Sequence, residues 1–232
     1  EWKNDRWGIL IGGRLDKHNM VDNVIFSPRA NLRFNPTQNI NLRLSYSSGF
    51  RAPQAFDEDM HIENVGGTVA MIERAKDLKE EKSQSFSVSA DMYHRFGAFQ
   101  TNLLIEGFYT RLTDVFVLGK PYDRGDGILV KTRSNGPGAK VMGLTLEGKV
   151  AYLSILQIQA GLTLQRSRYD EPHKWHDDAP AEKKIFRTPD TYGYFTATCT
   201  PIKPLSIALS GTYTGRMLVQ RMDITAENAE LG

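Results

Sequence analysis

The feature of this sequence that most limits its fold is an alternation of apolar and polar residues that recurs almost from end to end. Side chains that alternate with a period of two point to opposite faces of a β-strand, so the pattern predicts strands with one apolar face. The predicted strands cover nine ranges, which are 5–17, 24–35, 39–49, 80–95, 98–118, 127–152, 155–169, 187–200 and 204–218. The predicted fold class is therefore all-β.

Individual ranges show how clear the pattern is. In the third range, Leu42, Leu44 and Tyr46 alternate with polar residues. Only the segment from Tyr192 to Cys199 leaves open which of its faces is apolar. The sixth range is long and is expected to kink at 135–138, where a proline removes a ladder donor and two glycines permit a bulge.

The connections between the predicted strands alternate strictly in length. Short ones fall at 35–38, 96–98, 153–154 and 201–204, and long ones at 18–23, 50–79, 119–126 and 170–186. This order predicts an antiparallel up-and-down meander with all short turns on one side. Outer-membrane barrels have this arrangement, with short periplasmic turns and longer extracellular loops.

A soluble β-sandwich or barrel shows the same alternation, because the pattern does not tell where the apolar face points. Two features favour a membrane. Several strands reach the ~9–11 residues that cross a bilayer at a tilt. Aromatic residues also form two groups at the ends of the apolar stripes, as in membrane interfaces. These groups are Trp7, Phe34, Phe99 and Tyr152 near the short turns, and Phe26, Tyr46, Phe86, Tyr109 and Tyr213 near the long loops.

Composition excludes several classes of protein. A net charge of +2 gives no reason to expect a nucleic-acid partner. No run approaches ~20 apolar residues, which excludes a transmembrane helix. Cys199 is the one cysteine, so the chain forms no internal disulfide and no cysteine-based metal site. The first residues lack the apolar run of a signal peptide, so we expect Glu1 to lie inside a longer parent chain.

Short motifs in a fixed order resemble those of TonB-dependent outer-membrane receptors. The motifs are Phe26–Arg29, Leu44–Pro53, Leu78–Ser83, Phe108–Thr110 followed by Asp114, Gly143–Glu147, Arg187–Pro189 and Tyr213–Arg216. Each is weak alone, but together they cover nearly the whole chain at strand-compatible spacing. One departure is Glu80, where the family often has proline. That difference affects only the expected geometry of the local turn.

The resemblance implies that residues 1–232 are a partial transmembrane β-barrel domain, about nine strands of a 22-stranded barrel with its plug domain and final strands absent. It implies a receptor in the bacterial outer membrane that takes up a scarce nutrient such as a ferric siderophore, haem or cobalamin. The implied partners are outer-membrane lipid, the receptor's own plug domain, TonB and the small-molecule nutrient. The resemblance implies no cofactor and no enzymatic activity. The alternative that stays open is a soluble all-β ligand- or glycan-binding module.

Two polar clusters in the long loops are candidate ligand-binding sites. Closely spaced carboxylates in the first could hold a hard cation. The second joins two histidines to a tryptophan and a carboxylate, which suits a metal or a metal chelate. The candidate residues are Asp57, Glu58, Asp59 and His61 in the first loop, and His173, Trp175, His176 and Asp177 in the second. A solvated polar loop is the simpler interpretation of both, and whether either binds a metal is left open.

No catalytic constellation is visible in the sequence. A β-barrel enzyme such as an outer-membrane lipase would need a positioned Ser-His pair, and the sequence offers none. The arginines of the polar faces, Arg14, Arg29, Arg33 and Arg43, are expected to line the lumen of the barrel.

Overall fold

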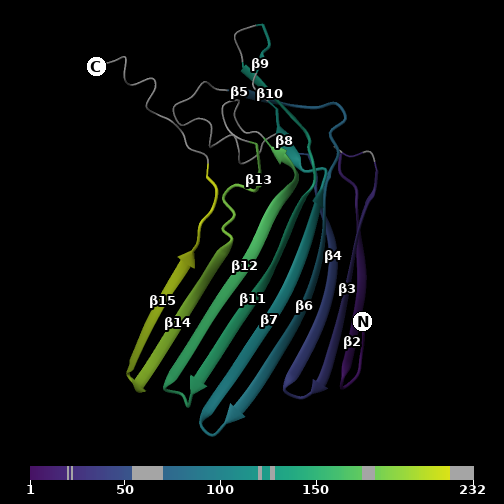
Figure 1. Ribbon diagram of the computed structural model, residues 1–232. Helices are drawn as coiled ribbons and strands as arrows, with labels where there is room; N and C mark the ends of the chain where they lie inside the picture. Colours follow the sequence, from purple (N-terminus) through teal and green to yellow (C-terminus); the bar gives the residue numbers. More distant parts are fainter. Residues whose placement is uncertain are drawn as a thin grey trace, which may run out of the picture.

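The computed structural model of the chain describes residues 1–19, 21, 23–53, 70–119, 122–125, 129–173 and 181–219. Over these residues it consists of strands, turns and extended segments (Figure 1). None of this part of the chain forms a helix long and apolar enough to cross a membrane.

The main sheet has eleven strands and is an antiparallel meander. Its long strands are β2 (Trp7–Asp16), β3 (Ile25–Thr37), β4 (Ile40–Arg51), β6 (Glu81–Phe96), β7 (Phe99–Thr113), β11 (Ala139–Tyr152), β12 (Leu156–His173), β14 (Thr191–Ile202) and β15 (Leu205–Thr214). Each pairs with the next in this order. The short strands β1 (Trp2–Lys3) and β13 (Glu182–Lys184) pair with β2 and β12. Every long strand has at least the length that a membrane crossing needs.

The predicted meander is confirmed. Each of the nine predicted ranges overlaps one long strand, and the strands tilt in a common direction (Figure 1). Five of the strands, β3, β4, β6, β12 and β14, run one to four residues past the predicted end. The four short turns lie together at the lower end of Figure 1, and the strand ends that border the longer connections lie at the upper end. We call these the turn end and the loop end.

Two predicted strands were too long. The range 98–118 divides into β7 and β8 (Phe116–Leu118), because Asp114 adopts a left-handed conformation with φ of 54° that interrupts the strand. The range 127–152 divides into β10 (Leu129–Asn135) and β11, and the break falls at residues 136–138, where the kink was expected. The break is larger than a kink, since β10 leaves the main sheet.

A second, four-stranded sheet forms at the loop end from β5 (Ala70–Arg74), β8, β9 (Tyr122–Asp123) and β10 (Figure 1). Strands β5 and β10 pair in parallel over residues 70–74 and 129–133. The segment 50–79 was predicted only as a long connection, so this strand was missed. Val130 and Arg133 of β10 are buried.

The two faces of the main sheet differ sharply. Cross-strand register places Leu44, Val88 and Leu144 on one face, which we call the outer face. Large apolar side chains there are exposed, with Ile11 at 77% and Leu15 at 71% of full exposure. A soluble sandwich would cover such a face with a second sheet. Among the described residues, only Val21, Ile25, Val130 and Ala139 are buried apolar side chains, so the main sheet has no packed core on either side.

Register also assigns the segment that the sequence left open. Because Gly193 pairs with Leu162 and Tyr194 pairs with Gly161, Phe195 shares the outer face with Leu162, and Tyr194 points to the opposite, inner face. The sheet is not closed by the described strands: β2 and β1 form one edge, and β15 forms the other.

The two predicted aromatic groups lie at the expected ends of the outer face. Near the turn end, the Trp7 and Phe34 rings stack with centroids 4.3 Å apart, and the Phe99 and Tyr152 rings lie 4.8 Å apart. Near the loop end, the Tyr46 and Phe86 rings lie 4.7 Å apart. Offset and tilted ring pairs of this kind add to stability beyond their buried area.

Candidate functional site

The loop residues predicted to bind a ligand fall almost entirely outside the described part of the chain. This holds for Asp57, Glu58, Asp59 and His61, and for Trp175, His176 and Asp177. His173 ends β12, where its backbone pairs with Glu182 of β13, and its side chain is not described. The structure therefore leaves these assignments as predictions. Within the described ranges, no group of three or more His, Cys, Asp or Glu side chains is close enough to hold a metal ion.

The loop-end sheet is anchored to the main sheet by polar contacts. Glu81 at the start of β6 accepts hydrogen bonds from the backbone N–H of Phe116 at 3.0 Å and from Arg51 at 3.4 Å. The Arg51 guanidinium lies 4.8 Å from the centre of the Phe116 ring. Asn135 donates to the carbonyls of Lys79 and Asp114 at 3.1 and 2.8 Å. The ends of β4 and β6 and the residue after β7 are thereby held to β8 and β10 of the loop-end sheet.

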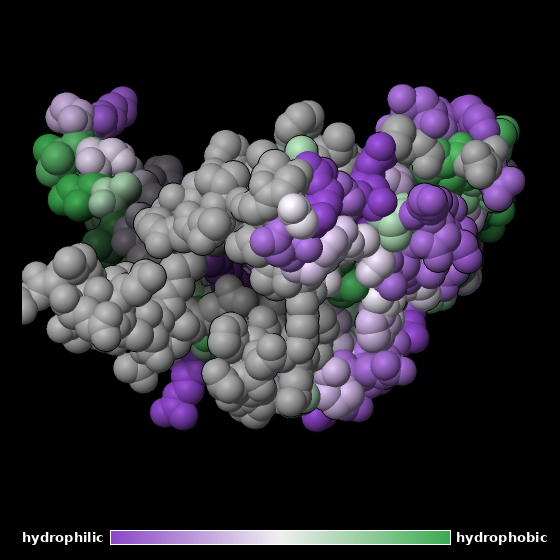
Figure 2. Space-filling model, turned by 90° about the horizontal axis from the view of Figure 1, so that it is seen from above, coloured by the Kyte–Doolittle hydropathy of each residue, from purple (hydrophilic) through white to green (hydrophobic). Residues whose placement is uncertain are grey.

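Charged pairs continue around the loop end, where hydrophilic side chains dominate much of the described surface (Figure 2). Burial by itself raises the pKa of Glu80. Hydrogen bonds from Lys82 and from the backbone amide of Glu80, together with the nearby lysine charges, lower this pKa by more, so it lies below its ordinary value. Lys82 Nζ lies 2.9 Å from the Glu80 carboxylate. Arg124 pairs with Glu73 of the loop-end sheet at 3.2 Å. Each of these two pairs joins one cation to one carboxylate.

The inner face is polar and hydrogen-bonded across strands. The prediction that Arg14, Arg29, Arg33 and Arg43 share one face is confirmed by register, and this face lies opposite Leu32 and Leu44. Hydroxyl pairs join neighbouring strands, with Ser85 and Thr110 Oγ atoms 2.9 Å apart and Thr145 and Thr163 3.0 Å apart. Such a face suits a wet lumen, where water can bind the polar groups that neighbouring strands leave without a partner.

A cluster around Glu147 of β11 was not predicted from the sequence. Tyr194 of β14 donates to the Glu147 carboxylate at 2.5 Å, and Gln159 of β12 donates to it at 3.0 Å. Lys149 Nζ lies 3.3 Å from the same carboxylate. Tyr194 reaches across an intervening strand because Gly161 of β12, which lies between Glu147 and Tyr194 in register, has no side chain. The one sequence feature that could have indicated this cluster was a glycine inside a long strand, which often marks a close approach of another group.

This geometry predicts that Gly161→Ala destabilises the barrel by about 1–3 kcal/mol, as overpacking does. An added Cβ would lie 2.6 Å from the Tyr194 ring, so the ring must move and its hydrogen bond to Glu147 is lost. Gly148→Ala is the matched control, because its Cβ would meet nothing within 4 Å. Denaturant unfolding in a bilayer measures both costs. Equal losses of unfolding free energy at the two glycines would contradict the inference that the missing side chain at Gly161 makes room for Tyr194.

The main sheet is a single layer of long tilted strands, apolar on one face and polar on the other. It has short turns at one end and the loop-end sheet at the other. These features together define the wall of a transmembrane β-barrel. The sequence of residues 1–220 matches the family described as TonB dependent receptor-like, beta-barrel. The chain belongs to this family, whose barrels are outer-membrane proteins of Gram-negative bacteria. Its members are receptors and transporters.

Solved structures share the fold. The siderophore receptor PirA from Acinetobacter baumannii superposes with a TM-score of 0.66 at 15% identity, covering 92% of this chain and 32% of that one. PirA from Pseudomonas aeruginosa gives 0.65 at 18% identity, covering 90% and 38%. The copper transporter OprC gives 0.56 at 13% identity, covering 85% and 30%. The chain thus spans about a third of these proteins. No curated protein matches the sequence.

Proposed function

We propose that residues 1–232 form part of the barrel wall of a TonB-dependent receptor that imports a scarce nutrient across the outer membrane. The observation that carries this proposal is the two-faced sheet of a family member: apolar side chains such as Ile11 and Val88 face outward, and arginines, glutamate and hydroxyls face inward. The inner face meets the plug domain and water, and the loop end meets the nutrient. TonB supplies the energy for transport through the plug. The barrel itself carries out no chemistry.

The first candidate nutrient is a ferric siderophore. Two structures with the same fold are siderophore receptors, although a third transports copper, and fold alone does not choose between them. Haem and cobalamin are the other candidates. We propose the two loop clusters as contacts for this ligand. Histidine and carboxylate side chains there suit a metal chelate, and Trp175 suits an aromatic chelating group.

The receptor that contains this chain is expected to bind one of these nutrients with sub-micromolar affinity and to need TonB for uptake. Titration with a ferric siderophore, haem, cobalamin and copper measures selectivity, and growth on the preferred nutrient in strains with and without TonB measures coupling. Combined Trp175→Ala and His176→Ala substitution should weaken binding by about tenfold or more, since aromatic side chains dominate binding energies.

His94→Ala is the matched control, because His94 lies near the turn end of β6, on the side away from the loops. It should leave the dissociation constant unchanged. Uptake that persists without TonB would reject the proposed function. Loss of binding in the His94 variant alone would instead place the ligand away from the loops.

A further inference from the structure

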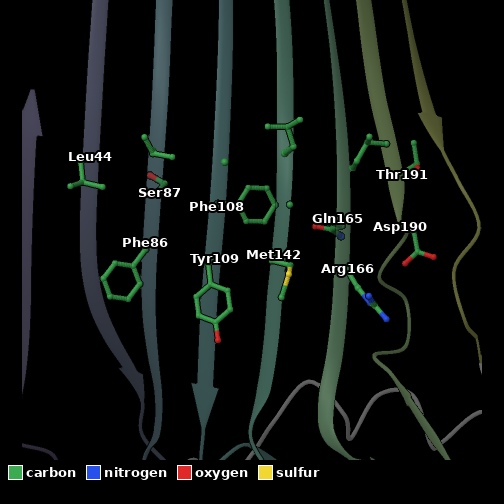
Figure 3. A pocket seen from close by; sticks show the side chains of 15 residues that line it. Leu44, Phe86, Ser87, Phe108, Tyr109, Met142, Gln165, Arg166, Asp190 and Thr191 are labelled. Atoms are coloured by element: carbon green, nitrogen blue, oxygen red, sulfur yellow. The ribbon is translucent and has the colours of Figure 1, made fainter. Parts of the chain in front are cut away.

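Two neighbouring hollows with shared lining residues lie on the outer face near the loop end, and the proposed function uses neither. The first has a volume of about 750 Å³ and is lined mainly by apolar side chains of β4, β6, β7, β11 and β12 (Figure 3). The second, of about 340 Å³, adjoins it toward the loops. Met142 and Arg166 line both hollows.

The apolar hollow exists because one position in a cross-strand row has no side chain. Val88, Gly107, Leu144 and Leu164 stand opposite one another on β6, β7, β11 and β12. A Cβ at Gly107 would have only an ordinary contact, at 3.7 Å from Val88 Cγ1. The gap therefore leaves a trough between Val88 and Leu144 that is wide enough for an extended hydrocarbon chain.

The next row toward the loops changes from apolar to cationic. Phe86, Tyr109, Met142 and Arg166 lie side by side on adjacent strands (Figure 3). Beyond them, Arg111, Lys140 and Arg168 stand opposite one another in register. Like charges directly opposite destabilise a sheet, because their Cβ atoms are only ~5 Å apart.

Two carboxylates, Asp170 and Asp190, line the hollows, and both are already engaged. Asp190 pairs with Lys184 at 2.6 Å. Asp170 binds Arg111 through two contacts of 2.7 and 2.6 Å. Lys183, which also lines the second hollow, donates to the Asp170 backbone carbonyl at 2.9 Å. Within the described ranges, Lys140, Arg166 and Arg168 form no ion pair, and the buried Nε of Arg168 has no hydrogen-bond partner. The second hollow therefore carries a net positive charge, which favours binding of an anion.

The position of the two hollows in the membrane indicates which kind of anion they bind. Long loops lie on the extracellular side of outer-membrane barrels, so this cationic row lies at the headgroup level of the outer leaflet. The apolar trough lies directly below it, among the acyl chains, and Tyr109 lies between them, where interfacial aromatics gather. A molecule that fits both hollows has an anionic headgroup and a hydrocarbon chain.

We propose that this part of the outer face binds a phosphorylated lipid of the outer leaflet. Arg166 and Arg168 hold its phosphate, since guanidinium groups bind phosphate through paired hydrogen bonds, and the Lys140 ammonium adds a compact positive charge. One acyl chain lies in the trough at Gly107. The site depends on the outer-membrane location and is independent of which nutrient the receptor imports.

The test titrates the detergent-purified receptor that contains this chain with bisphosphorylated lipid A and measures the dissociation constant by native mass spectrometry. Phosphatidylethanolamine and inorganic phosphate are the comparison probes. Lipid A is expected to bind saturably and at least tenfold more tightly than either, because only it satisfies both hollows. Lys140→Gln and Arg166→Gln should each weaken lipid A binding by about tenfold, the effect of losing one charge-assisted hydrogen bond. Gly107→Phe should weaken it by filling the trough.

Two matched controls separate the site from general effects. Arg95→Gln removes an arginine on the inner face near the turn end, and Gly148→Phe fills a glycine position elsewhere on the outer face. Both should bind lipid A as the unchanged receptor does. Three results would each overturn the proposal. Phosphatidylethanolamine could bind as tightly as lipid A, inorganic phosphate could bind as tightly as lipid A, or the control variants could weaken lipid A binding as much as the site variants do. Nutrient uptake, measured separately, tests the proposed function and leaves this result unaffected.

Discussion

Leu44→Arg is expected to destabilise the receptor that contains this chain by roughly 2–4 kcal/mol in a bilayer, the cost of a basic side chain at the midplane of a barrel's lipid face. Leu44 lies on the outer face, opposite Leu32 and Val88, and its side chain is half exposed in the isolated sheet. In a membrane that exposed surface is covered by acyl chains. Urea unfolding of the receptor in lipid vesicles measures the change.

Ser87→Arg is the matched control for this substitution. Ser87 neighbours Val88 on β6 but points to the inner face, opposite Ser45 and Phe108. The same basic side chain should cost much less there, because it reaches the water of the lumen instead of acyl chains. Equal costs at Leu44 and Ser87 would reject the assignment of the apolar face to lipid.

The isolated chain is expected to associate in water and to disperse in detergent. Leu209 and Val88 are 63% and 60% exposed, and they belong to an apolar face that continues across all the long strands. Soluble monomers rarely expose a contiguous apolar patch above a few hundred Å². The two sheet edges, at β2 and β15, add unpaired backbone groups that favour pairing between copies. Light scattering after size-exclusion chromatography, with and without detergent, measures the difference.

Two sets of serine substitutions provide a further comparison. Changing Leu44, Val88 and Leu144 to serine should reduce association in water, because all three lie on the outer face. Changing Leu104, Phe108 and Val141, which lie on the inner face, should have little effect. A monodisperse monomer without detergent in the unchanged chain would support the alternative of a soluble all-β binding module.

The strands and the meander were predictable from the sequence because the information is local. A period of two marks a strand wherever it occurs, and the lengths of connections such as 35–38 and 50–79 order the strands without knowledge of their contacts. The break at 136–138 was also visible, because proline and glycine act on the backbone within a residue or two. The candidate loop residues, from Asp57 to Asp177, remain predictions because the described residues do not include their side chains.

Contacts between strands distant in the sequence were decided only by the tertiary structure. The parallel pair of β5 and β10 joins segments separated by more than fifty residues, and the sequence of neither segment indicates which strand it pairs with. The outward direction of Phe195 follows from the register of β14 against β12. The gap at Gly161 that lets Tyr194 reach Glu147, and the row of Arg111, Lys140 and Arg168, likewise exist only once three strands are aligned. Alternation determines which residues share a face, whereas register, a property of pairs of strands, determines which of them meet.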